Sequence, residues 1–380
     1  MPKRATGLTK KGDYWQIDKQ VRGYGRLCES TGTSDLEEAE RHLNRRLEQI
    51  RQQLVYGVRQ RRLFREAATK YLQENLHKDS IATDAIHLKQ LDKWIGDVPL
   101  DQIHDGTLAA FVKHRLGEGR KRKTVNLALQ VVRRICNLAS RSWRDEFGKT
   151  WLETAPLITM LDTKDARPPY PLSWEEQTHL LKHLMPHLQR MVLFKVNTGN
   201  REDEVCQLRW KWEVEVPELE TSVFIIPRGI VKNDEDRVVV LNRVAKSVIE
   251  ECRGQHKEFV FTWKRGPKGK PTPTGSMNNT AWQDGRKAAS DSYEDVFGYP
   301  APEGFKTLHV HDLKHTFGRR LRAAGVSLET RKVLLGHKSD DITTHYSAPE
   351  LLELIEAANR VCFDKSRKSP ELTILKRKAG

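Results

Sequence analysis

The stretch 311–317, HDLKHTF, decides how the second half of this chain is read. His311 and Lys314 are three positions apart, so a helix through this stretch places the imidazole and the ammonium group on one face. His315 lies in the same helix, and for it a buried, hydrogen-bonded position is the simpler interpretation. The stretch therefore predicts a helix that places a hydrogen-bond donor beside a cation.

Two further clusters precede this stretch. In residues 198–204, TGNREDE, a helix end and a glycine turn are followed by Arg201, and Glu204 lies one helical turn further on. In the other cluster, Lys232 stands beside a turn between two strand-like apolar runs. These runs are residues 223–226 and 238–241.

Two short motifs follow the stretch downstream. Residues 335–337, LGH, place His337 directly after a glycine turn, and residues 343–346, TTHY, end at Tyr346. The clusters have no shared structural reason to occur together, so we interpret them as parts of one site.

The side chains of these clusters suit the transfer of a phosphoryl group. Attack on a phosphodiester spreads charge over the non-bridging oxygens, so catalysis needs fixed cations, an in-line nucleophile and an acid for the leaving oxygen. Arg201 offers a planar fork for two phosphate oxygens, and Glu204 is placed to hold that fork. Lys314 and His311 supply a second cation and a donor, and His337 adds another donor.

In order, spacing and flanking apolar pattern, these motifs resemble the catalytic half of the tyrosine recombinases, in particular the phage-type, lambda-like integrases. The family pattern is an arginine after a Thr-Gly turn, a hairpin lysine, a His-x-x-Arg helix, a Leu-Gly-His turn and a tyrosine shortly beyond it. The chain matches it at Arg201, Lys232, His311, His337 and Tyr346.

The resemblance implies roles for the remaining residues and partners for the protein. Lys232 would give a proton to the departing 5′-oxygen, and Tyr346 would form a covalent 3′-phosphotyrosyl link that stores the bond energy for religation. No metal, ATP or other cofactor is expected. The implied partners are double-stranded DNA at attachment sites, a homotetramer on synapsed DNA, a host DNA-bending protein and an excisionase.

One position departs from the family pattern, because Lys314 stands where a second arginine is usual. Lysine is a point charge and not a bidentate clamp, so this exchange is not conservative at a phosphate site. The sequence predicts reduced but retained catalysis. The alternative is a catalytically weak or silent DNA-binding or architectural protein derived from an integrase, in which Tyr346 is dispensable.

A metal-dependent nuclease is a third interpretation. It would use His309, His311 and His315, because a His-x-His spacing can suit a metal ion. No group of acidic residues accompanies these histidines in the sequence. This interpretation is therefore the weakest, and no metal site is predicted.

The composition points to a nucleic acid partner. The chain has 66 Lys and Arg against 51 Asp and Glu, a formal net charge of +15 and a pI near 9.5, which suits a polyanion. No apolar run approaches the roughly 18 residues that span a bilayer, and the N-terminal sequence MPKR lacks the apolar stretch of a signal peptide. The expected location is the cytoplasm of a bacterial cell, on DNA.

The chain is expected to be a multidomain α+β protein. Residues 1–60 predict a small β-sheet plus a helix, which resembles the arm-type DNA-binding domain of the larger integrases. Residues 61–161 predict an all-α core-binding bundle, and the proline-rich linker 162–172 cannot continue a helix. A mainly α catalytic domain with a small antiparallel sheet is expected at 173–360. The basic C-terminal tail, 361–380, would pack onto a neighbouring subunit, as the resemblance implies.

Two basic groups in the first half are candidate DNA contacts. Arg22 and Arg26 belong to the predicted small sheet, which can lie in a DNA groove. The run Arg120-Lys121-Arg122-Lys123 precedes a predicted helix that Thr124 would cap. There, backbone N–H groups and lysines can bind a phosphate together.

Overall fold

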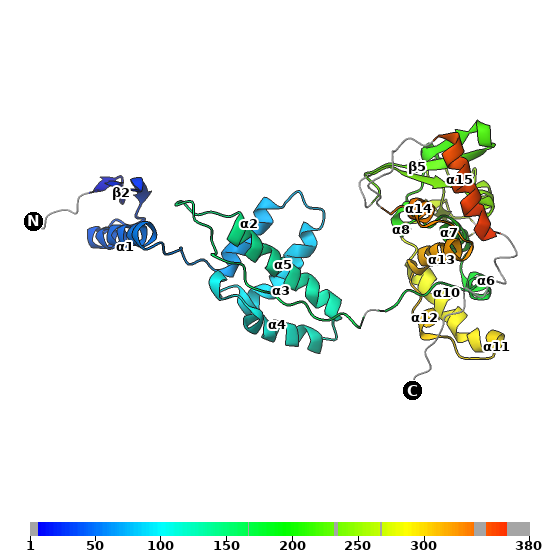
Figure 1. Cartoon of the computed structure of the whole chain (residues 1–380), viewed down its shortest axis with the longest axis horizontal. Coiled ribbons are helices and arrows are strands. Elements are labelled where there is room, and N and C mark those ends of the chain that lie inside the picture. Colours follow the sequence, from blue (N-terminus) through cyan, green and yellow to red (C-terminus); the bar gives the residue numbers. More distant parts are fainter. Residues whose placement is uncertain (1–6, 166, 232–234, 267, 338–346, 363–380) are drawn as a thin grey trace, which may run out of the picture. The chain divides into compact units, whose positions relative to one another are not determined.

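The computed structural model describes residues 7–165, 167–231, 235–266, 268–337 and 347–362. The chain divides into two compact units, 1–167 and 168–380. In the described residues, helices dominate and three small antiparallel sheets accompany them, which confirms the expected α+β class (Figure 1). None of the helices in these ranges combines the length and apolarity that a membrane crossing needs.

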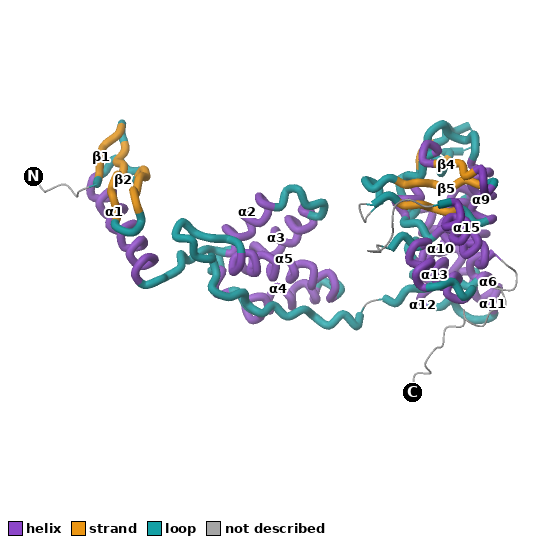
Figure 2. The backbone as a smooth tube through the Cα atoms, turned by 45° about the horizontal axis from the view of Figure 1, so that its top comes forward, coloured by secondary structure: helices purple, strands orange, loops and turns teal. Residues whose placement is uncertain are grey.

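The first unit begins with a three-stranded antiparallel sheet that packs against helix α1 (Leu36–Val55) (Figure 2). Alternation along the second strand buries Trp15 and Ile17 on one face. Helix α1 covers this face with Leu43 and Ile50, which lie seven positions apart on one stripe. The strands are β1 (Leu8–Lys11), β2 (Tyr14–Val21) and β3 (Gly25–Ser30).

Four helices follow around a separate apolar core, in which Phe64, Leu91 and Ile135 are fully buried. The segment 142–161 was predicted as part of this bundle but is irregular; it joins the core through side chains such as Trp143. The helices are α2 (Phe64–Glu74), α3 (Ile81–Ile95), α4 (Asp105–Gly117) and α5 (Arg122–Arg141), with a short 3-10 turn η1 (Leu100–Gln102) before α4.

The second unit is mainly helical around a large apolar core and one three-stranded sheet in the order β4-β5-β6. The runs predicted as strands at 223–226 and 238–241 are confirmed, since they form most of β5 (Thr221–Ile226) and β6 (Arg237–Val240). The other strands are β4 (Glu213–Val216), β7 (Thr262–Trp263) and β8 (Thr272–Pro273).

Among the helices of this unit, α7 contacts both α13 and α9, and α10 contacts α6. They are α6 (Trp174–His183), α7 (Pro186–Thr198), α8 (Glu202–Cys206), α9 (Arg243–Cys252), α10 (Thr280–Asp291), α11 (Tyr293–Phe297), α12 (Glu303–Lys306), α13 (Asp312–Ala323), α14 (Leu328–Leu334) and α15 (Ala348–Asn359), with 3-10 turns η2 (Trp210–Trp212), η3 (Pro217–Leu219) and η4 (Arg360–Cys362).

The end of α7 meets α13 and the turn after α14. A Cβ atom added to Gly199, the C-cap of α7, would lie 2.7 Å from Phe317 Cδ1 and 3.0 Å from Leu335 Cδ2. Gly199 also has a φ of 65°, a left-handed conformation that glycine adopts without steric cost. Glycine at this position therefore allows three segments that are distant in sequence to come together.

Candidate active site

Arg201 lies directly after the glycine turn, as the N-cap residue of α8. Its backbone amide donates to Glu204 Oε2 at 2.8 Å, and its guanidinium donates to Glu204 Oε1 at 3.0 Å. A second guanidinium nitrogen donates to the Gly336 carbonyl at 3.3 Å. Glu204 thus contacts the arginine fork, and the hydrogen bond to Gly336 ties Arg201 to the turn before His337.

Glu204 is the buried carboxylate of the site, with 1% of its surface exposed. Burial opposes its ionisation, but Arg237 and the hydrogen bonds from Arg201 outweigh it and lower the pKa of the Glu204 carboxyl. Glu204 is therefore an anion that fixes two guanidinium groups.

Lys314 and His311 lie at the start of α13, with His311 as its N-cap residue. Lys314 is 5% exposed, and its side-chain nitrogen donates to the Leu335 carbonyl. Burial, then the charges of Arg237 and Arg201, lower the pKa of Lys314 to about 6. Burial, then His315, lower the pKa of His311 to about 4. Without a bound anion, both groups are therefore held toward their neutral forms at pH 7.

His337 follows the Leu334–Gly336 turn at the end of α14, and its amide donates to the Lys332 carbonyl at 3.0 Å. Gly336 has a φ of 58°, which favours glycine. Burial, and then the nearby charges of Lys314 and Arg201, lower the pKa of His337. A neutral His337 retains one ring N–H donor for an oxygen ligand.

A cleft of about 500 Å³ opens beside these residues. Its walls include the predicted site residues His311, Lys314, His315 and His337. His315 is exposed, so the buried position predicted for it is wrong. The rest of the lining is mixed: Pro169, Pro171, Gly318, Leu328 and Leu335 contribute to it, together with four basic residues of α13 and α14. These further basic residues are Arg319, Arg322, Arg331 and Lys332. Such a lining suits a polyanion that extends beyond a single phosphate.

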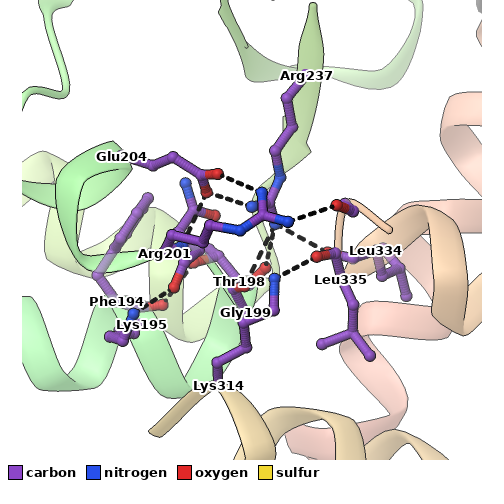
Figure 3. Close-up of polar contacts among 12 residues, drawn as sticks. Phe194, Lys195, Thr198, Gly199, Arg201, Glu204, Arg237, Lys314, Leu334 and Leu335 are labelled. Carbon is purple, nitrogen blue, oxygen red and sulfur yellow. Dashed lines mark hydrogen bonds and ion pairs between the residues drawn. The ribbon is translucent and has the colours of Figure 1, made fainter. Parts of the chain in front are cut away.

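Two further buried basic residues, Arg237 and Lys195, belong to the site and were not predicted from the sequence. Arg237 opens β6 and reaches Glu204 and the carbonyls around both glycine turns (Figure 3). Lys195, on α7, has no exposed surface and donates to the Asn200 carbonyl; burial lowers its pKa to about 8. For Lys195 the available signal was a single charge inside an otherwise apolar run, whereas Arg237 follows three acidic residues and offered no such signal.

The described cations of the site outnumber its buried carboxylate. Arg201, Arg237 and Lys195 lie around Glu204, Lys314 would add a further positive charge when protonated, and burial of unbalanced charge is costly. A phosphodiester anion beside Lys314 and Arg201 would offset this excess. The arrangement therefore favours an anionic ligand over a neutral one.

Two predicted catalytic residues, Lys232 and Tyr346, lie outside the described residues. Within the described ranges, no group of three or more His, Cys, Asp or Glu side chains is placed to hold a metal ion. This applies to His309, His311 and His315, the residues of the nuclease interpretation.

The predicted DNA contacts of the first unit are all exposed. Two of them, Arg26 and Arg122, also form hydrogen bonds within the protein. Arg26 forms a bidentate pair with Asp18, at 2.7 and 2.6 Å. In the basic run, the N-cap of α5 is Lys121 without a side-chain cap, so the predicted cap at Thr124 is wrong. The backbone amide of Arg122 donates to Asp165 at 2.9 Å, which occupies one of the amides expected to bind phosphate. Arg22, Arg120 and Lys123 are exposed.

Comparison with known proteins now identifies the family. The model of the phage integrase family matches residues 172–351, which contain Arg201, Lys314 and His337. Residues 172–351 of the chain therefore form a phage integrase family domain.

Individual members of the family resemble the chain over most of its length. The integrase of Salmonella phage P22 is 23% identical to this chain, and the alignment covers 98% of each of the two chains. The fold is similar to that of lambda integrase, in a dimer bound to a COC′ core site, with a TM-score of 0.54 at 14% identity; the match covers 89% of this chain and 93% of that one. It is also similar to residues 82–397 of the Tn1549 transposon integrase in complex with circular intermediate DNA, with a TM-score of 0.51 at 15% identity, covering 77% and 98%.

Proposed function

We propose that this phage integrase family member is a site-specific DNA recombinase that cleaves and rejoins DNA to integrate and excise a phage or a genomic island. One observation carries the proposal: Arg201 and Lys314, from motifs more than 100 residues apart, both donate to the turn that precedes His337. The three groups lie around one place where a phosphate could bind.

In the proposed reaction, Arg201, Lys314, His311 and His337 bind the non-bridging oxygens of the scissile phosphate. The Tyr346 hydroxyl gives up its proton to water as its oxygen attacks the phosphorus; a 3′-phosphotyrosyl bond forms, and the bond to the 5′-oxygen breaks as Lys232 gives that oxygen a proton. In ligation, a 5′-hydroxyl attacks the phosphotyrosyl bond and returns its proton to Lys232, and the released Tyr346 oxygen takes a proton from water. The number of phosphoester bonds is conserved, so no ATP is consumed and no metal is needed.

The proposed substrate is double-stranded DNA at attachment sites, bound by a homotetramer in the bacterial cytoplasm. Domain roles follow the sequence: arm-type contacts for residues 1–60, core contacts for 61–161, catalysis for 173–360 and subunit contacts for the tail 361–380. A host DNA-bending protein and an excisionase are proposed as helpers.

Covalent trapping tests this proposal. Purified protein is incubated without metal with a nicked duplex that carries the attachment core of its element, and denaturing electrophoresis then detects any protein–DNA adduct. We expect an adduct with the wild type and none with Tyr346→Phe. Strong DNA binding without an adduct in either protein would contradict the proposal.

The second candidate is an integrase derivative that binds DNA without efficient cleavage. Lys314 favours it, because burial and the neighbouring arginines lower its pKa to about 6 and leave little ammonium at neutral pH in the DNA-free protein. The trapping experiment separates the two candidates, since only the recombinase needs Tyr346.

A further inference from the structure

Three cations hold three successive carbonyl groups of the turn before His337. Arg237 donates to the Leu334 carbonyl at 3.1 Å, Lys314 to the Leu335 carbonyl, and Arg201 to the Gly336 carbonyl at 3.3 Å (Figure 3). The three come from β6, α13 and the start of α8. The position of this turn is therefore set by side chains from three separate elements.

Arg237 differs from the other two in its burial. Its side chain is 4% exposed, whereas that of Arg201 is 22% exposed. Lys314, although buried, lines the basic cleft, whereas neither Arg237 nor Arg201 does. Burial makes Arg237 less accessible to a phosphate than Arg201, and both of its terminal nitrogens donate to protein groups.

The Arg237 guanidinium joins both glycine turns of the site. One nitrogen pairs with Glu204, which also holds Arg201. Another lies 3.4 Å from the Thr198 and Gly199 carbonyls and 3.1 Å from that of Leu334. A planar group with five donors in fixed directions can satisfy all of these partners at once, whereas a lysine ammonium cannot span them.

The backbone lies close against this guanidinium. A Cβ atom on Gly336 would be 2.7 Å from Arg237 Nε and 2.8 Å from its Cζ. Any side chain at 336 would push the turn away from Arg237, and His337 with it.

We propose that Arg237 is a positioning residue for strand cleavage, which holds the Leu334–Gly336 turn and His337 against the Arg201–Glu204 segment without touching DNA. This inference rests on the proposed function, because it assigns Arg237 to the same phosphate site. Loss of the guanidinium would leave buried carbonyls unpaired and would let His337 and Arg201 move apart. A misplacement of about 1 Å can cost on the order of 100-fold in rate.

The test compares Arg237→Lys and Arg237→Met with the wild type. The matched control is Arg320→Lys, because Arg320 is also buried in this unit, donates to Gln177 at 2.8 Å and stacks on Trp174, away from the cleft. Three quantities are measured: the single-turnover rate of adduct formation on saturating nicked duplex, the Kd for that duplex, and the unfolding midpoint in urea.

We expect Arg237→Lys to slow adduct formation by about 100-fold while Kd changes less than about threefold. Arg320→Lys should lower the unfolding midpoint by a similar amount to Arg237→Lys without a comparable loss of rate. A wild-type rate in Arg237→Lys, or equal rate losses in both variants, would overturn the inference. No adduct with the wild type would instead overturn the proposed function, and the inference with it.

A pH profile adds a readout that a packing defect would not move. Arg237 is one of the cations that lower the pKa of Lys314. Arg237→Met removes this charge, so we expect the pH above which cleavage declines to shift upward, whereas Arg237→Lys should leave it in place. An unshifted profile in Arg237→Met would count against the assignment. The charged and titratable groups that face Lys314 are Arg237, Arg201, Glu204, Lys195, His311, His315 and His337.

Discussion

Lys314 carries an ammonium group into a region from which most water is excluded. Burial is the first reason that its pKa falls to about 6, and the charges of Arg237 and Arg201 add to the effect. A phosphate oxygen in the cleft would favour the charged form. The residue can therefore act as a cation mainly when its anionic ligand is bound, whereas an arginine would remain charged throughout.

This depressed pKa makes the stability of the protein depend on pH. In the unfolded chain Lys314 keeps its proton up to its ordinary pKa of 10.5, while in the folded protein it loses the proton at about 6. Between these values the unfolded state binds more protons, so the free energy of unfolding rises with pH and falls on acidification from 10.5 toward 6. One proton corresponds to a slope of at most about 1.4 kcal/mol per pH unit.

Urea unfolding of the wild type and Lys314→Met at pH 6, 7, 8 and 9 measures this contribution. We expect a shallower rise of the unfolding free energy with pH in the variant, because Lys195, whose pKa is about 8, still contributes from its own burial. Exposed Lys287→Met is the control and should leave the wild-type slope in place. Parallel curves for the wild type and Lys314→Met would show that Lys314 keeps its proton in the fold.

At the scale of elements, the end of α7 is the point on which the site geometry depends. Gly199 has a φ of 65°, which disfavours other residues. It also packs so closely against Phe317 and Leu335 that a Cβ atom would not fit. We expect Gly199→Ala to lower the free energy of unfolding by about 2–5 kcal/mol, from left-handed strain of about 1–2 kcal/mol and overpacking of about 1–3 kcal/mol. The shift of Arg201 should also slow cleavage.

Gly254→Ala is the matched control for this prediction. Gly254 has a φ of 79°, but a Cβ atom there would have no atom within 4 Å, so only the strain remains. Equal destabilisation of the two variants in urea unfolding would mean that the Phe317 contact yields without cost, and that Gly199 serves only its backbone conformation.

The elements also show which parts of the site were readable from sequence. Apolar period and turn chemistry predicted β5, β6 and the helix of His311 and Lys314, since these patterns are local. Arg237 could not be predicted as a site residue, because it contacts a carbonyl group nearly 100 residues away and no local sequence pattern reveals such a contact. Thr124 was assigned as a cap on residue type alone, whereas the helix begins earlier, at Arg122.

At the scale of the whole molecule, the charge of +15 is spread over both units and offers many phosphate contacts. The C-terminal segment 363–380 lies outside the described residues. Its sequence has six Lys and Arg, two acidic residues and an apolar group formed by Leu372, Ile374 and Leu375. Positive charge suits DNA, whereas an apolar group suits a neighbouring subunit. The basic residues and the apolar residues of this segment can therefore be tested separately.

We expect deletion of residues 363–380 to weaken assembly on DNA more than DNA binding by the monomer, because apolar contacts dominate the cores of protein interfaces while charge dominates DNA affinity. Leu372, Ile374 and Leu375 changed together to Ser should reproduce the assembly loss with monomer affinity unchanged. Replacement of the six basic residues by Gln should instead weaken monomer binding and reduce its salt dependence. Analytical ultracentrifugation and binding titrations at two salt concentrations measure both effects. If the Ser variant assembled normally, or lost monomer binding equally, the tail would act through DNA and not through a neighbouring subunit.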